Sequence, residues 1–186
     1  AKCDLLTAMV GEFPELQGTM GRYYALADGE PDEVATALAE QYLPRFAGDA
    51  LPASGAGLAL AVADKLDTLV GIFAIGQKPT GAKDPFGLRR SALGVLRILI
   101  ETGLALDLRE LIASAFASVR ADILRLDPKA AVPDEVPGEV YEFMMERLRA
   151  WYLERKNGPT AEMFEAVLDT AEQVRAFYGR LSALGG

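Results

Sequence analysis

The sequence predicts an all-α fold whose helices form two contiguous clusters. No stretch alternates apolar and polar residues between turn residues, as a half-buried strand would. Apolar residues instead recur at helical spacing along nearly the whole chain, and prolines, glycines and capping residues mark the ends of the segments. We therefore expect roughly seven to nine helices and no sheet.

Turn and capping residues divide the first part of the chain into three helices. Pro14 can begin a second helix that Gly29 closes, and Pro31 precedes an acidic first turn suited to a helix dipole. Pro44 then ends the third helix. The expected helices cover residues 1–13, 14–27 and 31–42.

The longest apolar segment, residues 57–75, is expected to be a buried helix. Asp64, Lys65 and Asp67 lie near its middle, where a membrane span tolerates ionisable groups least, so we interpret it as a buried helix of a soluble protein. Asp64, Thr68 and Gly71 share one narrow stripe with Asp67 beside it, and we expect this stripe to face a cavity or basic partners.

Two further helices have clear start signals. Asp84 can cap and Pro85 can occupy the first position of a helix over 85–103, and Asp107 with Glu110 has capping-box spacing for a helix over 107–124. An acidic, proline-containing linker over 127–137 then separates a domain at 1–126 from a smaller helical cluster at 138–186. Helices are expected in that cluster over 139–156, 161–168 and 171–184.

The composition excludes several classes of function. Apolar residues make up 51% of the 186 residues, enough for one core or two small ones, whereas a net charge of −8 argues against a protein that coats nucleic acid by bulk charge. Histidine is absent, which removes most metal hydrolases and every imidazole general base. We expect no metal and no cofactor in this chain.

The ends of the chain and its cysteine content suggest its origin. The sequence opens without Met and inside an expected helix, which suggests a piece of a longer polypeptide. No signal peptide is visible, and Cys3 is the only cysteine, so an intramolecular disulfide is impossible and a reducing cytoplasm fits best.

Positive charge is concentrated in residues 78–97. Asp84 is the only acid there, against five cations, and the start of the helix after it offers backbone N–H groups to a phosphate. The alternative is that Arg89 or Arg90 pairs with Asp64 or Asp67 on the neighbouring helix. The cations are Lys78, Lys83, Arg89, Arg90 and Arg97.

Three carboxylates form a second candidate site. Asp4, Asp64 and Asp67 could hold a divalent cation through oxygen ligands, although helix capping and ion pairing explain such acids more often.

Several short segments together form a specific sequence pattern. They include KCDL (2–5), EFPELQG (12–18), MGRYYA (20–25), DGE (28–30), QYLPRFAGD (41–49), ADKLDTL (63–69) and DPFGLRR (84–90). This pattern resembles the beta subunit of heterotetrameric bacterial glycyl-tRNA synthetase, and the resemblance is dense over residues 1 to about 100, looser over 143–151 and nearly absent at the end.

The resemblance implies a non-catalytic role in charging tRNA with glycine. In this family the alpha subunit forms glycyl-adenylate with ATP and magnesium, in an assembly of two alpha and two beta subunits, and the beta subunit supplies tRNA-binding domains, one of them an HD-like helical bundle. This chain is similar to that bundle, and Cys3-Asp4 and Asp64 stand where an active HD phosphohydrolase would have His-Asp and a later Asp. The resemblance therefore implies a degenerate HD site at Cys3, Asp4, Asp64 and Asp67.

The expected partners are therefore tRNA(Gly) and an alpha subunit, with Lys83, Arg89, Arg90 and Arg97 on tRNA phosphates. One face of the helix expected over 85–103 carries Arg90, Gly94 and Arg97, and Gly94 would leave room on that face for a phosphate. Two alternatives stay open: a structural helical spacer whose arginines are internal ion pairs, and a surviving metal phosphohydrolase, which the lack of histidine opposes.

Overall fold

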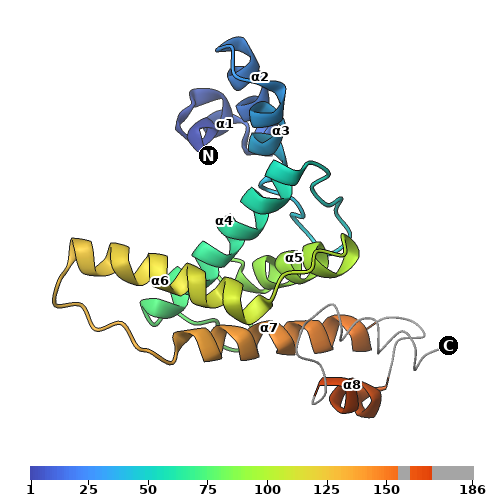
Figure 1. The fold of residues 1–186 in the computed structure, drawn as a ribbon. Helices are drawn as coiled ribbons and strands as arrows, with labels where there is room; N and C mark the ends of the chain where they lie inside the picture. Colours follow the sequence, from blue (N-terminus) through green and yellow to red (C-terminus); the bar gives the residue numbers. More distant parts are fainter. Residues whose placement is uncertain (155–159, 169–186) are drawn as a thin grey trace. The chain divides into compact units, whose positions relative to one another are not determined.

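A computed structural model describes residues 1–154 and 160–168, and it confirms the all-α prediction (Figure 1). No strand is present in these residues beyond one isolated bridge between Thr80 and Lys83. The helix expected over 171–184 lies outside the described residues. The helices are η1 (Cys3–Leu6), α1 (Ala8–Glu12), η2 (Pro14–Leu16), α2 (Thr19–Ala27), α3 (Asp32–Glu40), α4 (Gly55–Ala74), α5 (Leu88–Glu101), α6 (Leu108–Leu126), α7 (Val136–Leu153) and α8 (Ala161–Leu168), where η marks a 3-10 helix.

The chain divides into two compact units, Ala1–Asp64 and Lys65–Gly186, and the division falls inside α4. We call them unit 1 and unit 2. The linker expected over 127–137 lies within unit 2, where α6 and α7 on its two sides pack against each other. A boundary there, between a domain at 1–126 and a cluster at 138–186, stays a prediction.

The helix expected over residues 1–13 is interrupted at Thr7. Thr7 has an extended backbone, its hydroxyl donates to the Asp4 carbonyl at 2.7 Å, and the same oxygen accepts from the Val10 N–H at 3.4 Å. The threonine side chain thus competes with the helical ladder and caps the next helix. The expected apolar face is largely uncovered within this structure, with Leu6 91% exposed and Phe13 50% exposed.

Gly18 causes the second departure from the expected helices. The segment after Pro14 forms only the short η2, and α2 begins after Gly18, whose φ is +81°. A Cβ on Gly18 would lie 2.8 Å from the Tyr42 ring, so both the backbone conformation and the space require glycine. The sequence placed the end of α2 correctly: Gly29 has φ +84°, and the Glu30 N–H donates to the Ala25 carbonyl at 2.9 Å in a Schellman motif.

Glu40, the last residue of α3, organises the start of α4. Its carboxylate accepts hydrogen bonds from the Ala53 N–H at 2.9 Å, the Ser54 N–H at 3.1 Å and the Ser54 hydroxyl. Partial burial alone would raise the pKa of Glu40, but the hydrogen bonds from Ser54 and Ala53 outweigh it and hold the pKa below its ordinary value. The Ser54 hydroxyl oxygen in turn accepts from the Gly57 N–H at 3.0 Å, capping α4.

Unit 2 is arranged around α7, which contacts α5, α6 and α8. Its inward residues Val140, Met144 and Leu148 are fully buried, and Phe143 places its ring 5.4 Å from that of Phe73. Asp107 caps α6 as predicted, accepting from the N–H groups of the second and third residues of the helix at 2.7 and 3.0 Å. In the described part of the chain, no helix combines the length and apolar character that a membrane crossing would need.

We predict that Gly57→Ala destabilises the chain by about 1–3 kcal/mol through overpacking. A Cβ at this position would lie 2.0 Å from Glu40 Oε2 and 2.8 Å from Glu40 Cβ, and the carboxylate is held by its three donors. Urea denaturation measures the loss. Gly55→Ala is the matched control, because nothing lies within 4 Å of its Cβ, and it should be neutral or stabilising. Equal effects at both positions would contradict the packing argument.

Candidate nucleic-acid interface

The basic segment begins with a tight turn that holds Lys83. Thr80 and Lys83 exchange backbone hydrogen bonds of 3.2 and 2.9 Å across Gly81 and Ala82, and Gly81 has φ +52°. The turn fixes the backbone of Lys83, whose side chain is exposed.

A second turn follows directly and corrects the predicted start of α5. The Gly87 N–H donates to the Asp84 carbonyl at 3.2 Å, with Pro85 at the second turn position and Gly87 at φ +66°. Because Gly87 is left-handed, the helix begins at Leu88, three residues later than Pro85. Asp84 still serves the helix start: its two carboxylate oxygens accept from the Leu88 and Arg89 N–H groups at 2.8 and 2.9 Å.

Two arginines at the start of α5 fold back onto these turns. The Arg89 guanidinium donates to the Gly81 carbonyl and so ties the helix to the first turn. The Arg90 guanidinium lies against Gly87, since a Cβ there would come within 2.8 Å of an Arg90 terminal nitrogen. Together the turns and α5 form a braced loop, residues 79–90, which we call the cationic loop.

The five cations of the basic segment have different surroundings. Lys78 forms an ion pair with Glu139 on α7, and Arg97 forms a bidentate pair with Glu101 one helical turn later, at 2.8 and 3.1 Å. Lys83 and Arg90 are exposed, and the structure shows neither with a side-chain partner among the described residues. These two cations are therefore the ones available to an external anion.

The predicted binding face of α5 is mostly covered. Gly94 is buried and Arg97 is only 8% exposed, because α5 packs in unit 2 on much of its circumference, leaving Arg90 as the exposed member of the three. A buried guanidinium already paired with Glu101 is poorly placed for a phosphate. Contact with tRNA at any of the four candidate cations stays a prediction.

The candidate acid Asp4 has a structural environment. It is 2% exposed, its Oδ2 accepts from the Gly18 N–H at 2.6 Å, and its Oδ1 accepts from the Tyr42 hydroxyl at 2.9 Å. Asp4 thereby links η1 to the glycine turn before α2 and to Tyr42, the second residue after α3. Even Gly21 is fitted to it, since a Cβ there would lie 3.2 Å from the Asp4 carboxyl carbon.

Tyr42 shows the electrostatic effect of this cluster. Burial raises its pKa to about 12, and the hydrogen bond to Asp4 and the charges of Asp4 and Asp64 act in the same direction. A hydrogen bond with Gln17 opposes the shift without cancelling it.

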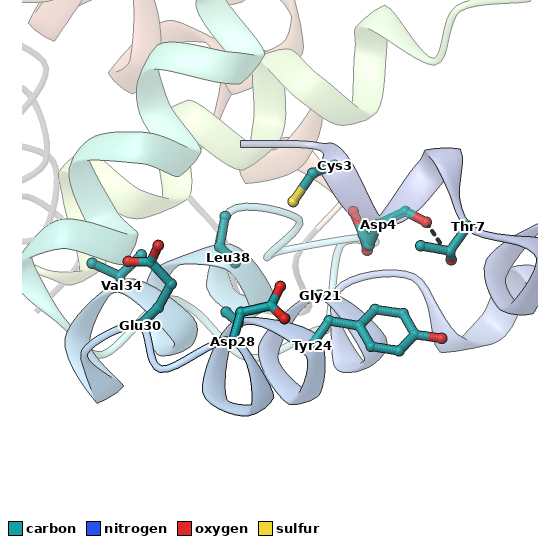
Figure 2. Close-up of a pocket in the computed structure, with 10 residues that line it drawn as sticks. Cys3, Asp4, Thr7, Gly21, Tyr24, Asp28, Glu30, Val34 and Leu38 are labelled. Atoms are coloured by element: carbon teal, nitrogen blue, oxygen red, sulfur yellow. Dashed lines mark hydrogen bonds between the residues drawn. The ribbon is translucent and has the colours of Figure 1, made fainter.

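The other members of the predicted degenerate site have different surroundings. Asp64 pairs with Lys2 at 2.6 Å, Asp67 is exposed in unit 2, and Cys3 is exposed. Cys3 and Asp4 line a pocket of about 460 Å³ in unit 1 together with the carboxylate residues Asp28 and Glu30 (Figure 2).

The residues present do not fit a metal. Both Asp4 oxygens face donors, and the described residues hold no group of three His, Cys, Asp or Glu side chains placed to bind an ion. No catalytic step through a metal is derived for this pocket.

Two residues of these sites were missed by sequence reasoning. Tyr42 donates to Asp4 through a contact between residues 38 positions apart, which the local sequence does not reveal. Phe86 is 45% exposed on the second turn of the cationic loop. A signal for it existed: an aromatic residue between Pro85 and Gly87, inside a turn, has few ways to be buried.

The family model and the relatives that match this chain describe the same kind of subunit. The family model described as glycyl-tRNA synthetase beta subunit matches residues 1–169. Relatives named glycine–tRNA ligase beta subunit include one from Chromohalobacter salexigens, 54% identical over 96% of this chain and 26% of its own length, and one from Hahella chejuensis, 56% identical over 90% of this chain and 23% of its own length. A third, from Pseudomonas fluorescens, is 59% identical over 82% of this chain and 21% of its own length. The chain thus spans about a quarter of the length of the relatives it matches.

We predict that Tyr42 ionises with a pKa of about 12 in the folded chain, against an ordinary value of 10.0. Because the pKa of Tyr42 is higher in the folded chain than in the unfolded chain, the protonated hydroxyl stabilises the fold. This stabilisation is complete below pH 10 and is lost as the pH rises toward 12. Ultraviolet titration of phenolate measures it. Tyr42→Phe should remove one late-titrating group, whereas Tyr23→Phe, at an exposed position, should leave it in place. A difference spectrum in which Tyr42 titrates together with exposed tyrosines would contradict the assignment.

Proposed function

The chain belongs to the glycyl-tRNA synthetase beta-subunit family, and on that premise we propose that it is a non-catalytic helical module of a glycine–tRNA ligase that helps to bind tRNA(Gly). In the complete enzyme, an alpha subunit would activate glycine with ATP and magnesium, in an assembly of two alpha and two beta subunits in the cytoplasm. This module would hold tRNA in place while the chemistry proceeds elsewhere.

The cationic loop is the observation that carries this proposal. The chain has a net charge of −8, so a polyanion can bind only where lysine or arginine side chains are not paired with carboxylates. Lys83 and Arg90 meet that condition, on a backbone fixed by two turns and the N-terminus of α5. Because the backbone is fixed in advance, only these side chains must be ordered when they bind phosphates, which lowers the entropic cost of binding.

The surroundings of Asp4 support a module without an active site. A catalytic or metal-binding carboxylate needs an oxygen directed at the substrate or ion, and both oxygens of Asp4 accept internal hydrogen bonds. The retained Asp of the HD-like pattern therefore holds the helices of unit 1 together. We expect no phosphohydrolase activity and no activation of glycine by this chain alone.

A purely structural spacer is the second candidate, and one observation favours it for part of the patch. Arg97 is buried and paired with Glu101, and Lys78 is paired with Glu139. The pair at Arg97 lies within α5, and the pair at Lys78 ties the loop before α5 to α7, so the proposal for tRNA binding rests on Lys83 and Arg90, with Arg89 bracing the loop between them.

We predict that Lys83→Ala and Arg90→Ala in the complete alpha-beta synthetase each weaken tRNA(Gly) binding and reduce the slope of log affinity against log salt by about 0.7–0.9. Each change removes one phosphate contact and leaves the fold intact, because both side chains are exposed. Binding is measured by fluorescence anisotropy across a series of salt concentrations.

Two variants serve as controls for that experiment. Lys78→Ala removes a cation that is already paired, so its effect on the salt slope should be clearly smaller. Arg97→Ala should lower the melting temperature and leave the slope unchanged, because it removes a buried side chain from the packing of α5. If Arg97→Ala changes the slope while Lys83→Ala and Arg90→Ala do not, the cationic loop is not the binding surface.

A further inference from the structure

Phe86 lies on the cationic loop and is not explained by binding to phosphates alone. Its side chain is 45% exposed, on the turn between Asp84 and Gly87. Exposure alone does not distinguish this ring, because Phe13 and Phe46 are more exposed and isolated apolar side chains are common on protein surfaces. The distinguishing feature of Phe86 is its place in a tight turn of the cationic loop.

The two free cations flank this ring along the chain. Lys83 immediately precedes the turn that carries Phe86, and the Arg90 guanidinium folds back against Gly87, the next residue. The carboxylate of Asp84, the acid of this turn, is directed onto the Leu88 and Arg89 N–H groups. The surface around Phe86 is therefore cationic and aromatic, and its backbone is fixed before any ligand arrives.

We propose that Phe86 stacks on the base of an unpaired nucleotide while Arg90 and Lys83 bind the phosphates beside it. This rests on the proposed tRNA binding and specifies its target: a single-stranded segment of the RNA, not a paired stem. Bases within a helix are stacked on both faces and present only edges and phosphates, whereas an unpaired base offers a free face to an aromatic side chain. Cations without an aromatic ring would suffice for a stem.

An acidic peptide is the competing ligand for such a surface. It would satisfy Lys83 and Arg90 equally, but it offers carboxylates where the loop offers an aromatic face. The base accounts for all three side chains together.

The test compares two RNAs bound to the complete alpha-beta synthetase: a blunt duplex and the same duplex with a single-stranded 3′ extension. Phe86→Leu keeps an apolar side chain and removes the stacking face, so it should weaken binding of the extended RNA by between about 5-fold and about 150-fold. Binding of the blunt duplex should be unchanged. Phe86→Trp should retain the preference, and Tyr23→Leu, at an exposed aromatic residue in unit 1, should change nothing.

The outcomes separate this inference from the function on which it rests. If Phe86→Leu has no effect while Lys83→Ala and Arg90→Ala weaken binding of both RNAs, stacking is refuted and the phosphate site stands. If none of the three changes matters, tRNA binding by the loop fails as well. Equal losses for the two RNAs, a lowered melting temperature, or displacement of the extended RNA by oligoglutamate as readily as by unlabelled RNA would also overturn the stacking proposal.

Discussion

The Asp84 carboxylate is the constraint on which the cationic loop depends. In a chain with this excess of acids, an arginine or lysine is expected to find a carboxylate, as the exposed Lys78 and the buried Arg97 do. Asp84, the acid nearest to Lys83 and Arg90 in the sequence, is instead held by two backbone N–H groups at the start of α5. This cap begins the helix and at the same time keeps the charge of Asp84 directed at the helix dipole, so two neighbouring cations stay available.

Asp4 shows the same use of a carboxylate in unit 1, where apolar packing is weaker. Alanine and valine supply much of the buried apolar surface there, including Val10, Ala25 and Ala35. A carboxylate that joins the Gly18 N–H to the Tyr42 hydroxyl adds a directional link that small side chains cannot supply. Asp4 thus contributes to the fold of unit 1 through its two hydrogen bonds.

Local signals in the sequence predicted the end of α2 and the cap of α6, but they misplaced the starts of α2 and α5 and predicted burial poorly. The structure confirms three predictions that depend on neighbouring residues alone: the end of α2 at Gly29, the cap of α6 by Asp107, and a helical fold without strands in the described residues. The exposure of Leu6 and Phe13 could not be predicted, because helical spacing shows that a face is apolar and says nothing about what covers it. Thr7 interrupts a helix because its hydroxyl competes with the backbone for hydrogen bonds. The free-energy difference is small, and the spacing of apolar residues does not reveal it.

The candidate site could be predicted only in part, because the sequence shows its charge but not its burial. The excess of cations over residues 78–97 is visible in the sequence, but the burial of Arg97 depends on how α5 packs within unit 2. Glu101, four residues later, was the available sign that Arg97 had an internal partner.

Amide hydrogen exchange of the complete synthetase, with and without tRNA(Gly), tests the central claim most directly. Our account predicts that tRNA slows exchange in peptides covering the cationic loop, residues 79–90, while peptides covering the Asp4 cluster at residues 1–18 exchange at the same rate in both states. Slowed exchange at residues 1–18 with no change at 79–90 would contradict it.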